Sequence, residues 1–319
     1  MKAWQYMGHQ APIQINEVPE PVPSPTQVVI DVKAAGLCHS DIMYMETGDQ
    51  AMPFLPMTQG HENAGIICAL GSEVQGFKIG DAVGVCSSGV QPPLGMFTPG
   101  GFADKLAADY RDLARVPAGL DFSLAALATD AGMTSYHAMI KAGGAKAGMK
   151  VGVIGFGGLG QIGARAAVLA GCEVHVAEMK EDVWPLAYEA GVKECVKDAA
   201  EWARPLSANL HDDAGFDLIV DYAGFNTTQK AVDAVKRGTG KVVQVGLGLP
   251  TFTIITSSIL GKTIIGSLGG SVQDIEEVFD LMLKGEIRPA YEEITFDGIG
   301  AGLARLKAGQ VTGRLVARW

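Results

Sequence analysis

The stretch VGVIGFGGLGQIGARAAVLAG (residues 151–171) decides the fold of this chain. It begins with a short apolar run typical of a buried strand and ends with the spacing of a helix. Between the two, glycines at 155, 157 and 160 match G-x-G-x-x-G, the turn by which a βαβ unit approaches a pyrophosphate. The first glycine makes the turn, the second lets the phosphates come close, and the third lets helix and strand pack. The N-terminus of the helix adds partial positive charge.

A second strand-like run, CEVHVAE (172–178), ends in an acid 23 residues after Gly155. An acid here accepts hydrogen bonds from ribose hydroxyls and repels a 2′-phosphate, so Glu178 favours NAD over NADP. Lys180, two residues on, would soften that rejection. The alternatives are an ordinary βα turn and a solvated charge at the end of a strand. The candidate cofactor-binding residues in this half are Gly155, Gly157, Gly158, Leu159, Gly160, Glu178 and Gly246.

The predicted secondary structure changes near residue 125. Residues before it contain strand-like runs broken by Gly and Pro, such as VVIDVKAAGL (28–37) and AGIICALG (64–71). From residue 149 onward, strands alternate with helices, through FDLIVDYAG (216–224) and GKVVQVGLG (240–248). This alternation predicts a right-handed parallel sheet with helices on both faces. The predicted fold class is therefore α/β, a Rossmann doubly wound parallel sheet joined to a β-rich domain.

Composition excludes several classes of partner. The formal net charge of −10 argues against binding to nucleic acid or to an acidic membrane surface. The N-terminal MKAWQYMGHQAPIQ lacks the apolar core of a signal peptide, and no run reaches ~18 apolar residues, so we expect neither a leader nor a membrane span. The five cysteines are odd in number and scattered, which predicts free thiols and a cytoplasmic location.

Two short motifs in the N-terminal half suggest a metal site. GLCHSD (36–41) and GHENAG (60–65) contain Cys38 and His61, residue types that zinc prefers as ligands. A catalytic zinc needs three protein ligands and an open fourth position. By itself, however, a lone cysteine is usually a small buried hydrophobe, and a lone histidine is more often a core residue than a ligand.

GLCHSD, GHENAG and GFGGLG (155–160), in this order and spacing, resemble the zinc alcohol dehydrogenases of the medium-chain dehydrogenase/reductase family. The likeness extends to the C-terminal GRLVARW (313–319). It implies a GroES-like catalytic domain over residues 1–131, completed by 269–319, and a Rossmann NAD-binding domain over 132–268.

The resemblance also implies roles for residues near the metal. Cys38 and His61 would bind zinc, and Asp41 would orient a ligand from behind. Glu62 would lie close behind the metal. Ser40 would hydrogen-bond the alcohol and pass on its proton.

Away from the metal, the resemblance implies that His39 contacts the cofactor pyrophosphate and that Arg314 helps to hold the same cofactor.

Many members have a cysteine where this chain has Asp130, but a subset of bacterial secondary-alcohol dehydrogenases also has Thr-Asp-Ala-Gly there, with the aspartate as third zinc ligand. Zinc accepts a carboxylate oxygen. The alternative is that Asp130 only caps a helix that starts at this point.

Two departures from the family pattern concern the number of zinc ions and the length of the proton relay. Members with a structural zinc carry four closely spaced cysteines, whereas between Cys86 and Gly101 this chain has only SSGVQPPLGMFTPG. We therefore expect one zinc per chain. Some relatives extend the proton relay through a histidine where this chain has Met43, so here the relay would end at the ribose or in water.

Together these expectations describe a zinc-containing, NAD-dependent enzyme that transfers a hydride between NAD(H) and an alcohol/ketone or aldehyde pair, with medium-sized apolar primary or secondary alcohols as substrates. The alternatives are a zinc-free quinone or enoyl reductase of the same family and a non-catalytic relative that keeps the cofactor site. The apolar run 253–268 further predicts a homodimer or homotetramer formed through the Rossmann domains.

Overall fold

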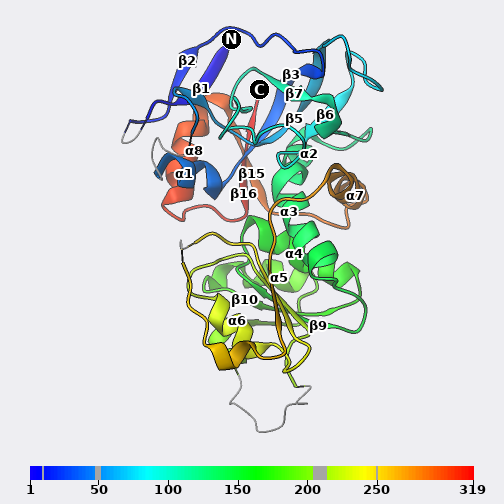
Figure 1. Cartoon of the computed structure of the whole chain (residues 1–319), viewed down its shortest axis with the longest axis vertical. Coiled ribbons are helices and arrows are strands. Elements are labelled where there is room, and N and C mark those ends of the chain that lie inside the picture. Colours follow the sequence, from blue (N-terminus) through cyan, green and yellow to red (C-terminus); the bar gives the residue numbers. More distant parts are fainter. Residues whose placement is uncertain (9–10, 47–51, 204–213, 249–250) are drawn as a thin grey trace. The chain divides into compact units, whose positions relative to one another are not determined.

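The computed structural model describes residues 1–8, 11–46, 52–203, 214–248 and 251–319. The chain divides into two compact units. Unit 1 comprises Met1–Met133, Gly270–Glu286 and Ala290–Trp319, and unit 2 comprises Thr134–Gly269 and Ile287–Pro289. Both chain termini belong to unit 1 (Figure 1).

Unit 1 is built on a seven-stranded sheet and a three-stranded sheet. The larger sheet has the order β15-β16-β3-β5-β6-β8, and β7 also pairs with β3. The smaller sheet has the order β2-β1-β4. The strands are β1 (Lys2–Tyr6), β2 (Gln14–Glu17), β3 (Gln27–Leu37), β4 (Met57–Thr58), β5 (Glu62–Leu70), β6 (Ala82–Val85), β7 (Lys105–Asp109), β8 (Leu113–Arg115), β15 (Tyr291–Thr295) and β16 (Arg314–Arg318).

Strand pairing in the larger sheet joins the two ends of the chain. Strand β3 lies antiparallel to β5, with Gly36 opposite Glu62, and antiparallel to β16, with Leu37 opposite Leu315. The side chains of Ile30, Leu37 and Leu315 lie in one apolar core. This register brings residues 37–38, 61–62 and 314 to one edge of the unit although they are far apart in the sequence.

The helices of unit 1 are α1 (His39–Glu46), α2 (Phe122–Leu127), α7 (Val272–Leu283) and α8 (Ile299–Lys307). Asp121 caps α2, because its side chain accepts a hydrogen bond from Ser123 N at 2.7 Å. The chain then continues into a π-helical turn, Ala128–Gly132, which contains Asp130. The helix therefore starts eight residues before Asp130, and the interpretation of Asp130 as the cap of a new helix is wrong.

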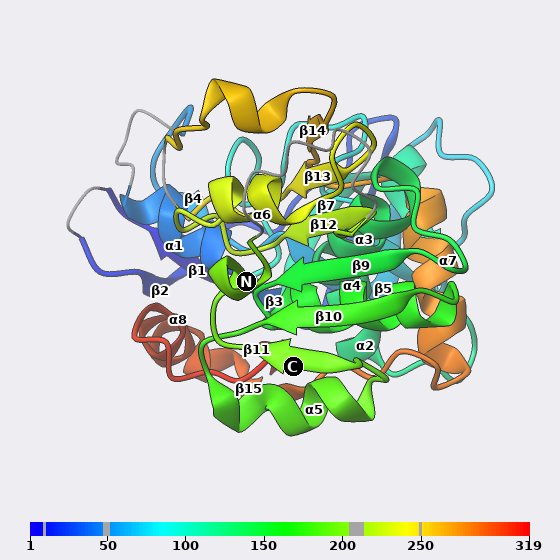
Figure 2. The same ribbon diagram turned by 90° about the horizontal axis from the view of Figure 1, so that it is seen from below.

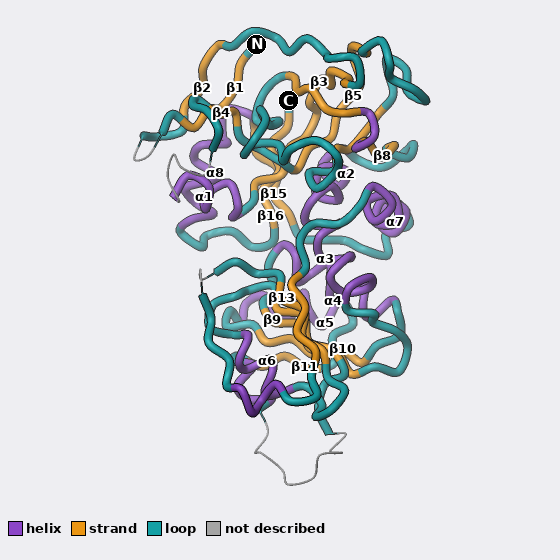
Figure 3. Tube along the Cα trace, viewed as in Figure 1, coloured by secondary structure: helices purple, strands orange, loops and turns teal. Residues whose placement is uncertain are grey.

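Unit 2 contains a six-stranded, entirely parallel sheet in the order β11-β10-β9-β12-β13-β14 (Figure 2). Alternate residues of its strands face opposite ways, so Val153 packs with α4 and α5 while Ile219 packs with α6. Figure 3 shows the strands between these helices. The elements are β9 (Lys150–Ile154), α4 (Gly158–Leu169), β10 (Glu173–Ala177), α5 (Trp184–Glu189), β11 (Glu194–Val196), β12 (Leu218–Asp221), α6 (Thr228–Ala234), β13 (Lys241–Gln244) and β14 (Thr263–Gly266).

This arrangement confirms the predicted fold class, a doubly wound parallel sheet with a separate β-rich unit. In the part of the chain that the structure describes, no helix has the length and apolar character needed to cross a bilayer.

Candidate active site

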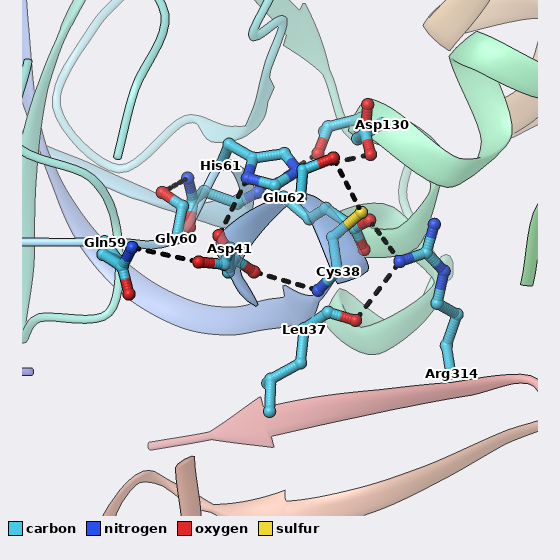
Figure 4. Close-up of polar contacts among 12 residues, drawn as sticks. Leu37, Cys38, Asp41, Gln59, Gly60, His61, Glu62, Asp130 and Arg314 are labelled. Atoms are coloured by element: carbon cyan, nitrogen blue, oxygen red, sulfur yellow. Dashed lines mark hydrogen bonds and ion pairs between the residues drawn. The ribbon is translucent and has the colours of Figure 1, made fainter. Parts of the chain in front are cut away.

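Four potential metal ligands converge in unit 1 (Figure 4). The ligand atoms of Cys38, His61, Glu62 and Asp130 all lie within 4.8 Å of one another. The first three side chains are buried, and that of Asp130 is 17% exposed. The cluster therefore combines a thiol, an imidazole and two carboxylates in a largely water-free position.

Two glycines make room for this convergence. Gly60 precedes His61 and has φ +95°, in the left-handed region, where a Cβ would also come within 2.4 Å of the Phe102 ring. Gly36 lies opposite Glu62, and a Cβ at position 36 would lie 1.9 Å from Glu62 Oε2. Only glycine at these two positions lets the backbone turn into β5 and leaves space for the Glu62 carboxylate.

Asp41, in the first turn of α1, contacts two residues of the cluster. Its Oδ1 lies 3.0 Å from His61 Nδ1, and its Oδ2 accepts a hydrogen bond from Cys38 N at 2.9 Å. A buried carboxylate facing Nδ1 holds the proton on that nitrogen and leaves Nε2 free to bind a metal. Nε2 points to the side of the ring where Asp130 Oδ2 lies, 3.4 Å away.

Arg314, the first residue of β16, supplies a buried positive charge. Its Nη1 lies 3.0 Å from Glu62 Oε1 and donates a hydrogen bond to Leu37 O at 3.2 Å. Among the described residues, no well-directed hydrogen bond reaches either carboxylate oxygen of Glu62. Burial raises the pKa of Glu62 well above its usual range in spite of the Arg314 charge.

The other groups of the cluster are also electrostatically coupled. Burial raises the pKa of the Cys38 thiol, but the Arg314 charge and the His61 hydrogen bond outweigh it, so the net pKa is lowered. For Asp130, burial is again outweighed, here by His61 and then Arg314, and the pKa falls below its usual range. Burial opposes a charge on His61, yet Asp41 and Asp130 raise its pKa well above the usual value.

This donor set fits a zinc ion. Zinc binds thiolate, imidazole and carboxylate ligands at a single centre. Acidic groups crowded into a buried site need a compensating cation, and Arg314 supplies a single positive charge. The two buried carboxylate oxygens of Glu62, which accept no hydrogen bond of good geometry from the described residues, also favour a cation at this position.

Ser40 and His39 lie at the start of α1, next to the cluster. Ser40 is half-buried, and its Oγ lies 3.6 Å from Cys38 Sγ. The His39 side chain is exposed. Ser40 therefore places a hydroxyl group beside the Cys38 sulfur.

The glycine-rich turn of unit 2 has the geometry of a phosphate cradle. Gly155 has φ +84°, and a Cβ on Gly160 would lie 1.9 Å from Gly155 O, so neither position accepts a side chain without strain. A Cβ on Gly157 would meet no atom within 4 Å, so this exposed position opens onto free space in front of α4. Gly158 and Leu159, half-buried, begin α4. The turn thus leaves room for a pyrophosphate at a helix N-terminus.

Glu178 lies against this turn. Its Oε2 accepts a hydrogen bond from Phe156 N at 2.8 Å, and its Oε1 accepts one from Lys180 N at 2.9 Å. The carboxylate is half-buried and keeps further lone pairs for a ligand. Gly246, the other candidate, follows β13, and its N–H donates to Asp221 O at 3.0 Å.

Comparison with known proteins supports this description. Residues 24–118 match the alcohol dehydrogenase GroES-like domain, and residues 158–284 match the zinc-binding dehydrogenase domain. An alcohol dehydrogenase from Geobacillus stearothermophilus is 31% identical, over 100% of this chain and 99% of its own length. The chain belongs to the zinc-binding alcohol dehydrogenases of the medium-chain dehydrogenase/reductase family. The predicted family and enzyme class are thereby confirmed.

Two further proteins are similar to nearly the whole of this chain. An alcohol dehydrogenase from Rhizobium meliloti is 31% identical over 96% of this chain and 95% of its own length. The structure of an acetophenone reductase from Geotrichum candidum, solved with NAD, superimposes with a TM-score of 0.85 at 28% identity, covering 100% of this chain and 97% of that one. The reaction class is accordingly the oxidoreduction of an alcohol and its carbonyl compound.

The cluster of potential metal ligands is also supported by residues that were not predicted from the sequence. Asn63 N donates to Thr129 Oγ1 at 3.1 Å, which in turn donates to Ala126 O at 2.7 Å. Gln59 Nε2 donates to Asp41 O at 3.2 Å. The first bond ties β5, which begins directly after His61, to the turn that carries Asp130, and the Gln59 bond ties the loop before His61 to α1. The only signal in the sequence is that these buried polar residues stand next to predicted ligands.

Proposed function

We propose that this enzyme oxidises medium-sized apolar alcohols, secondary ones included, to carbonyl compounds with NAD, using one zinc held by Cys38, His61 and Asp130. The observation that carries the proposal is the convergence of these ligand atoms, together with those of Glu62, in one cluster. When bound, the zinc supplies a Lewis acid that lowers the pKa of an alcohol. The NAD-bound relative and the alcohol dehydrogenase relatives support this chemistry.

The chain's own residues orient the ligands and move the proton. Asp41 fixes the His61 ring and the Cys38 backbone. The Ser40 hydroxyl, beside Cys38 Sγ, accepts the alcohol proton and passes it to the ribose or to water, because Met43 occupies the next relay position. Arg314, whose Nη1 lies 3.0 Å from Glu62 Oε1, places a buried positive charge beside the cluster.

We assign unit 1 to catalysis and unit 2 to NAD. The open position at Gly157, the N-terminus of α4 and the Glu178 carboxylate support an adenosine diphosphate site, and Glu178 disfavours a 2′-phosphate. His39, exposed at the start of α1, is proposed to meet the pyrophosphate. The contacts of Arg314 with Glu62 and Leu37 support a role in balancing the metal site, and its cofactor role stays a prediction.

One zinc per chain is proposed because the segment between Cys86 and Gly101 lacks the four closely spaced cysteines of a structural-zinc lobe. Asp112 Oδ1 and Oδ2 accept hydrogen bonds from Val90 N at 2.7 Å and from Gln91 N at 3.0 Å. At its far end, Gly101 N donates to Gly60 O at 2.9 Å. Backbone and Asp112 hydrogen bonds thus hold this segment, and one of them joins it to Gly60, the residue before His61.

We further propose a homo-oligomer and a cytoplasmic location, supported by an apolar sheet edge and by the free thiols. Strand β14 is an edge strand of the unit 2 sheet, and the exposed side chains of Ile255, Leu260 and Leu268 lie close to it in sequence. An apolar edge of this kind supports a homodimer or homotetramer formed through unit 2. All five cysteines are free, which supports a cytoplasmic location.

The test is an initial-rate screen of alcohols and ketones with NAD and NADP, beside zinc determined by elemental analysis. We expect one zinc per chain, a higher kcat/KM with NAD, and a higher kcat/KM for medium-sized apolar alcohols than for ethanol. An enzyme that is fastest on ethanol or on charged alcohols would contradict the substrate class. Absence of zinc, or of any turnover, would favour a zinc-free reductase or a non-catalytic relative.

A further inference from the structure

A fully buried carboxylate at the end of β12 belongs to none of the sites described above. Asp221 is 0% exposed and is the last residue of this strand. In an open parallel sheet, ligands bind at the carboxyl ends of the strands. Because β12 is parallel to β9 and β13, Asp221 lies at the same edge of the sheet as the glycine-rich turn that follows β9 and as Gly246, which follows β13.

The Asp221 side chain shapes the loop that follows it. Its Oδ1 accepts hydrogen bonds from Ala223 N and Gly224 N, both at 3.0 Å. Its Oδ2 accepts one from Thr227 Oγ1 at 2.6 Å. Asn226 has φ +58°, a left-handed conformation that asparagine tolerates, and it turns the chain so that Thr227 comes back to the carboxylate. One side chain thus closes residues 222–227 into a fixed loop.

Asp221 also joins this loop to the end of β13. Its backbone oxygen accepts hydrogen bonds from Val245 N at 2.9 Å and Gly246 N at 3.0 Å. Thr228 Oγ1 lies 3.3 Å from Asp221 Oδ2 and 2.7 Å from Gln244 Oε1, and Gln244 Nε2 donates to Gly246 O at 2.8 Å. The backbone and the side chain of Asp221 therefore hold the two strand ends in a single network.

The loop that Asp221 holds contacts both predicted cofactor segments. A Cβ on Gly155 would lie 3.3 Å from Ala223 Cβ, and a Cβ on Gly246 would lie 2.4 Å from Ala223 C. Tyr222 adds a further tie, because its hydroxyl donates to Ser135 O at 2.9 Å. A shift of residues 222–224 would therefore displace the phosphate turn and Gly246 together.

We propose that Asp221 is a positioning residue for the dinucleotide: it sets the relative placement of the glycine-rich turn and Gly246 without touching the cofactor. The proposal rests on the proposed NAD-linked function and names a residue on which NAD affinity depends. Loss of the carboxylate leaves two backbone N–H groups and a threonine hydroxyl without their acceptor, and the loop must rearrange to satisfy them.

Asp217, the residue before β12, provides a matched control. It precedes β12, where its Oδ2 accepts a hydrogen bond from Lys150 N at 2.8 Å and its Oδ1 pairs with Lys236 Nζ at 2.6 Å. It is thus a second hydrogen-bonded carboxylate in the same sheet, but at the amino ends of the strands. Its removal tests whether general destabilisation of unit 2 accounts for any effect.

The experiment measures NADH binding by fluorescence on the zinc-loaded enzyme, for the unmutated protein and for Asp221→Ala, Thr227→Val and Asp217→Ala. We expect the Kd for NADH to rise at least ~10-fold in Asp221→Ala and ~3-fold in Thr227→Val, the scale of lost buried hydrogen bonds, and to stay within ~2-fold in Asp217→Ala. In steady state the KM for NAD should rise while the KM for alcohol and the zinc content stay constant.

An unchanged Kd in Asp221→Ala would overturn the proposal, as would an equal rise in Asp217→Ala. Should Asp221→Ala fail to fold, Thr227→Val decides, because it keeps the side-chain volume and removes one hydroxyl; an unchanged Kd in this variant would then overturn it. Failure of the unmutated enzyme to bind NADH would instead overturn the proposed NAD-linked function, a result visible before any variant is made.

Discussion

The Asp41 carboxylate lies 3.0 Å from His61 Nδ1, and its second oxygen accepts a hydrogen bond from Cys38 N at 2.9 Å. Two proposed zinc ligands that stand 23 positions apart in sequence are thus oriented by one side chain. Such an arrangement fixes both the tautomer and the direction of the imidazole before a metal binds. The position of the zinc site should therefore depend on Asp41 as well as on the ligands.

Asp41→Asn should weaken zinc binding by ~10–100-fold, the usual effect of removing such a supporting carboxylate. An amide presents only one acceptor, so it cannot face both the His61 ring and the Cys38 N–H correctly. Zinc affinity is measured by competition with a chromogenic chelator. Asp81→Asn, at a carboxylate of unit 1 that pairs with Lys78 and Arg115, is the control and should keep its zinc. An unchanged zinc affinity in Asp41→Asn would show that the orientation of His61 and Cys38 does not depend on the Asp41 carboxylate.

Asp130→Asn should lose most of both zinc and activity, because the amide offers the metal only a neutral oxygen. Asp130→Cys should retain zinc, since a thiolate is a ligand that zinc prefers. Elemental analysis and initial rates on the three proteins provide the measurement. An Asn variant with full zinc and full rate would remove Asp130 from the site.

Ser40→Ala should lower kcat by ~10²-fold or more, the scale on which a positioned proton acceptor contributes. Zinc content should not change, because Ser40 is not among the converging ligands. Ser40→Thr keeps the hydroxyl and should recover part of the rate. Full activity in the alanine variant would assign the proton transfer to another group.

Glu178→Ser should narrow the preference for NAD over NADP, because the charge that repels a 2′-phosphate is gone. The structure adds a second expectation. Glu178 also accepts the Phe156 N–H at 2.8 Å, so affinity for NAD itself should fall moderately. Both effects are read from kcat/KM with each cofactor. Equal efficiency with NAD and NADP in the unmutated enzyme would refute the role assigned to Glu178.

Stability in acid should depend on Asp109. Hydrogen bonds from Arg111, with a further one from Thr26, lower the pKa of Asp109 to about 2 despite partial burial. Because the folded pKa lies below the unfolded value of ~3.9, the carboxylate stabilises the fold above pH ~4, and this contribution is lost as the pH falls towards 2.

Asp109→Asn should accordingly lower the free energy of unfolding by ~1–2 kcal/mol at pH 7. The gap to the unmutated protein should shrink below pH ~4. Urea unfolding between pH 7 and pH 3 measures both quantities. A gap that is the same at every pH would mean that the charge of Asp109 is not the cause.

Much of the fold could be predicted because its signals are local. The Gly155–Gly160 turn, the strands around it and the acid at 178 follow one another within a single βαβ unit, and their roles depend on backbone geometry that glycine alone permits. The residues of the metal cluster could be named from the resemblance of GLCHSD, GHENAG and TDAG to a known family. The helix-cap alternative for Asp130 could be rejected only when the start of the helix at Phe122 was known.

The sequence by itself determined the residue types of the site, the alternation of strands and helices, and the glycines without which the turns do not form. Only the tertiary structure decided that Arg314 pairs with Glu62, that Asp41 faces His61 and Cys38 at once, and that Asp221 joins the ends of β12 and β13. The physical reason is strand register. Periodicity along the chain reports which side of an element is buried, whereas contacts between residues as distant as Leu37 and Arg314 depend on which strands pair and on how they are aligned.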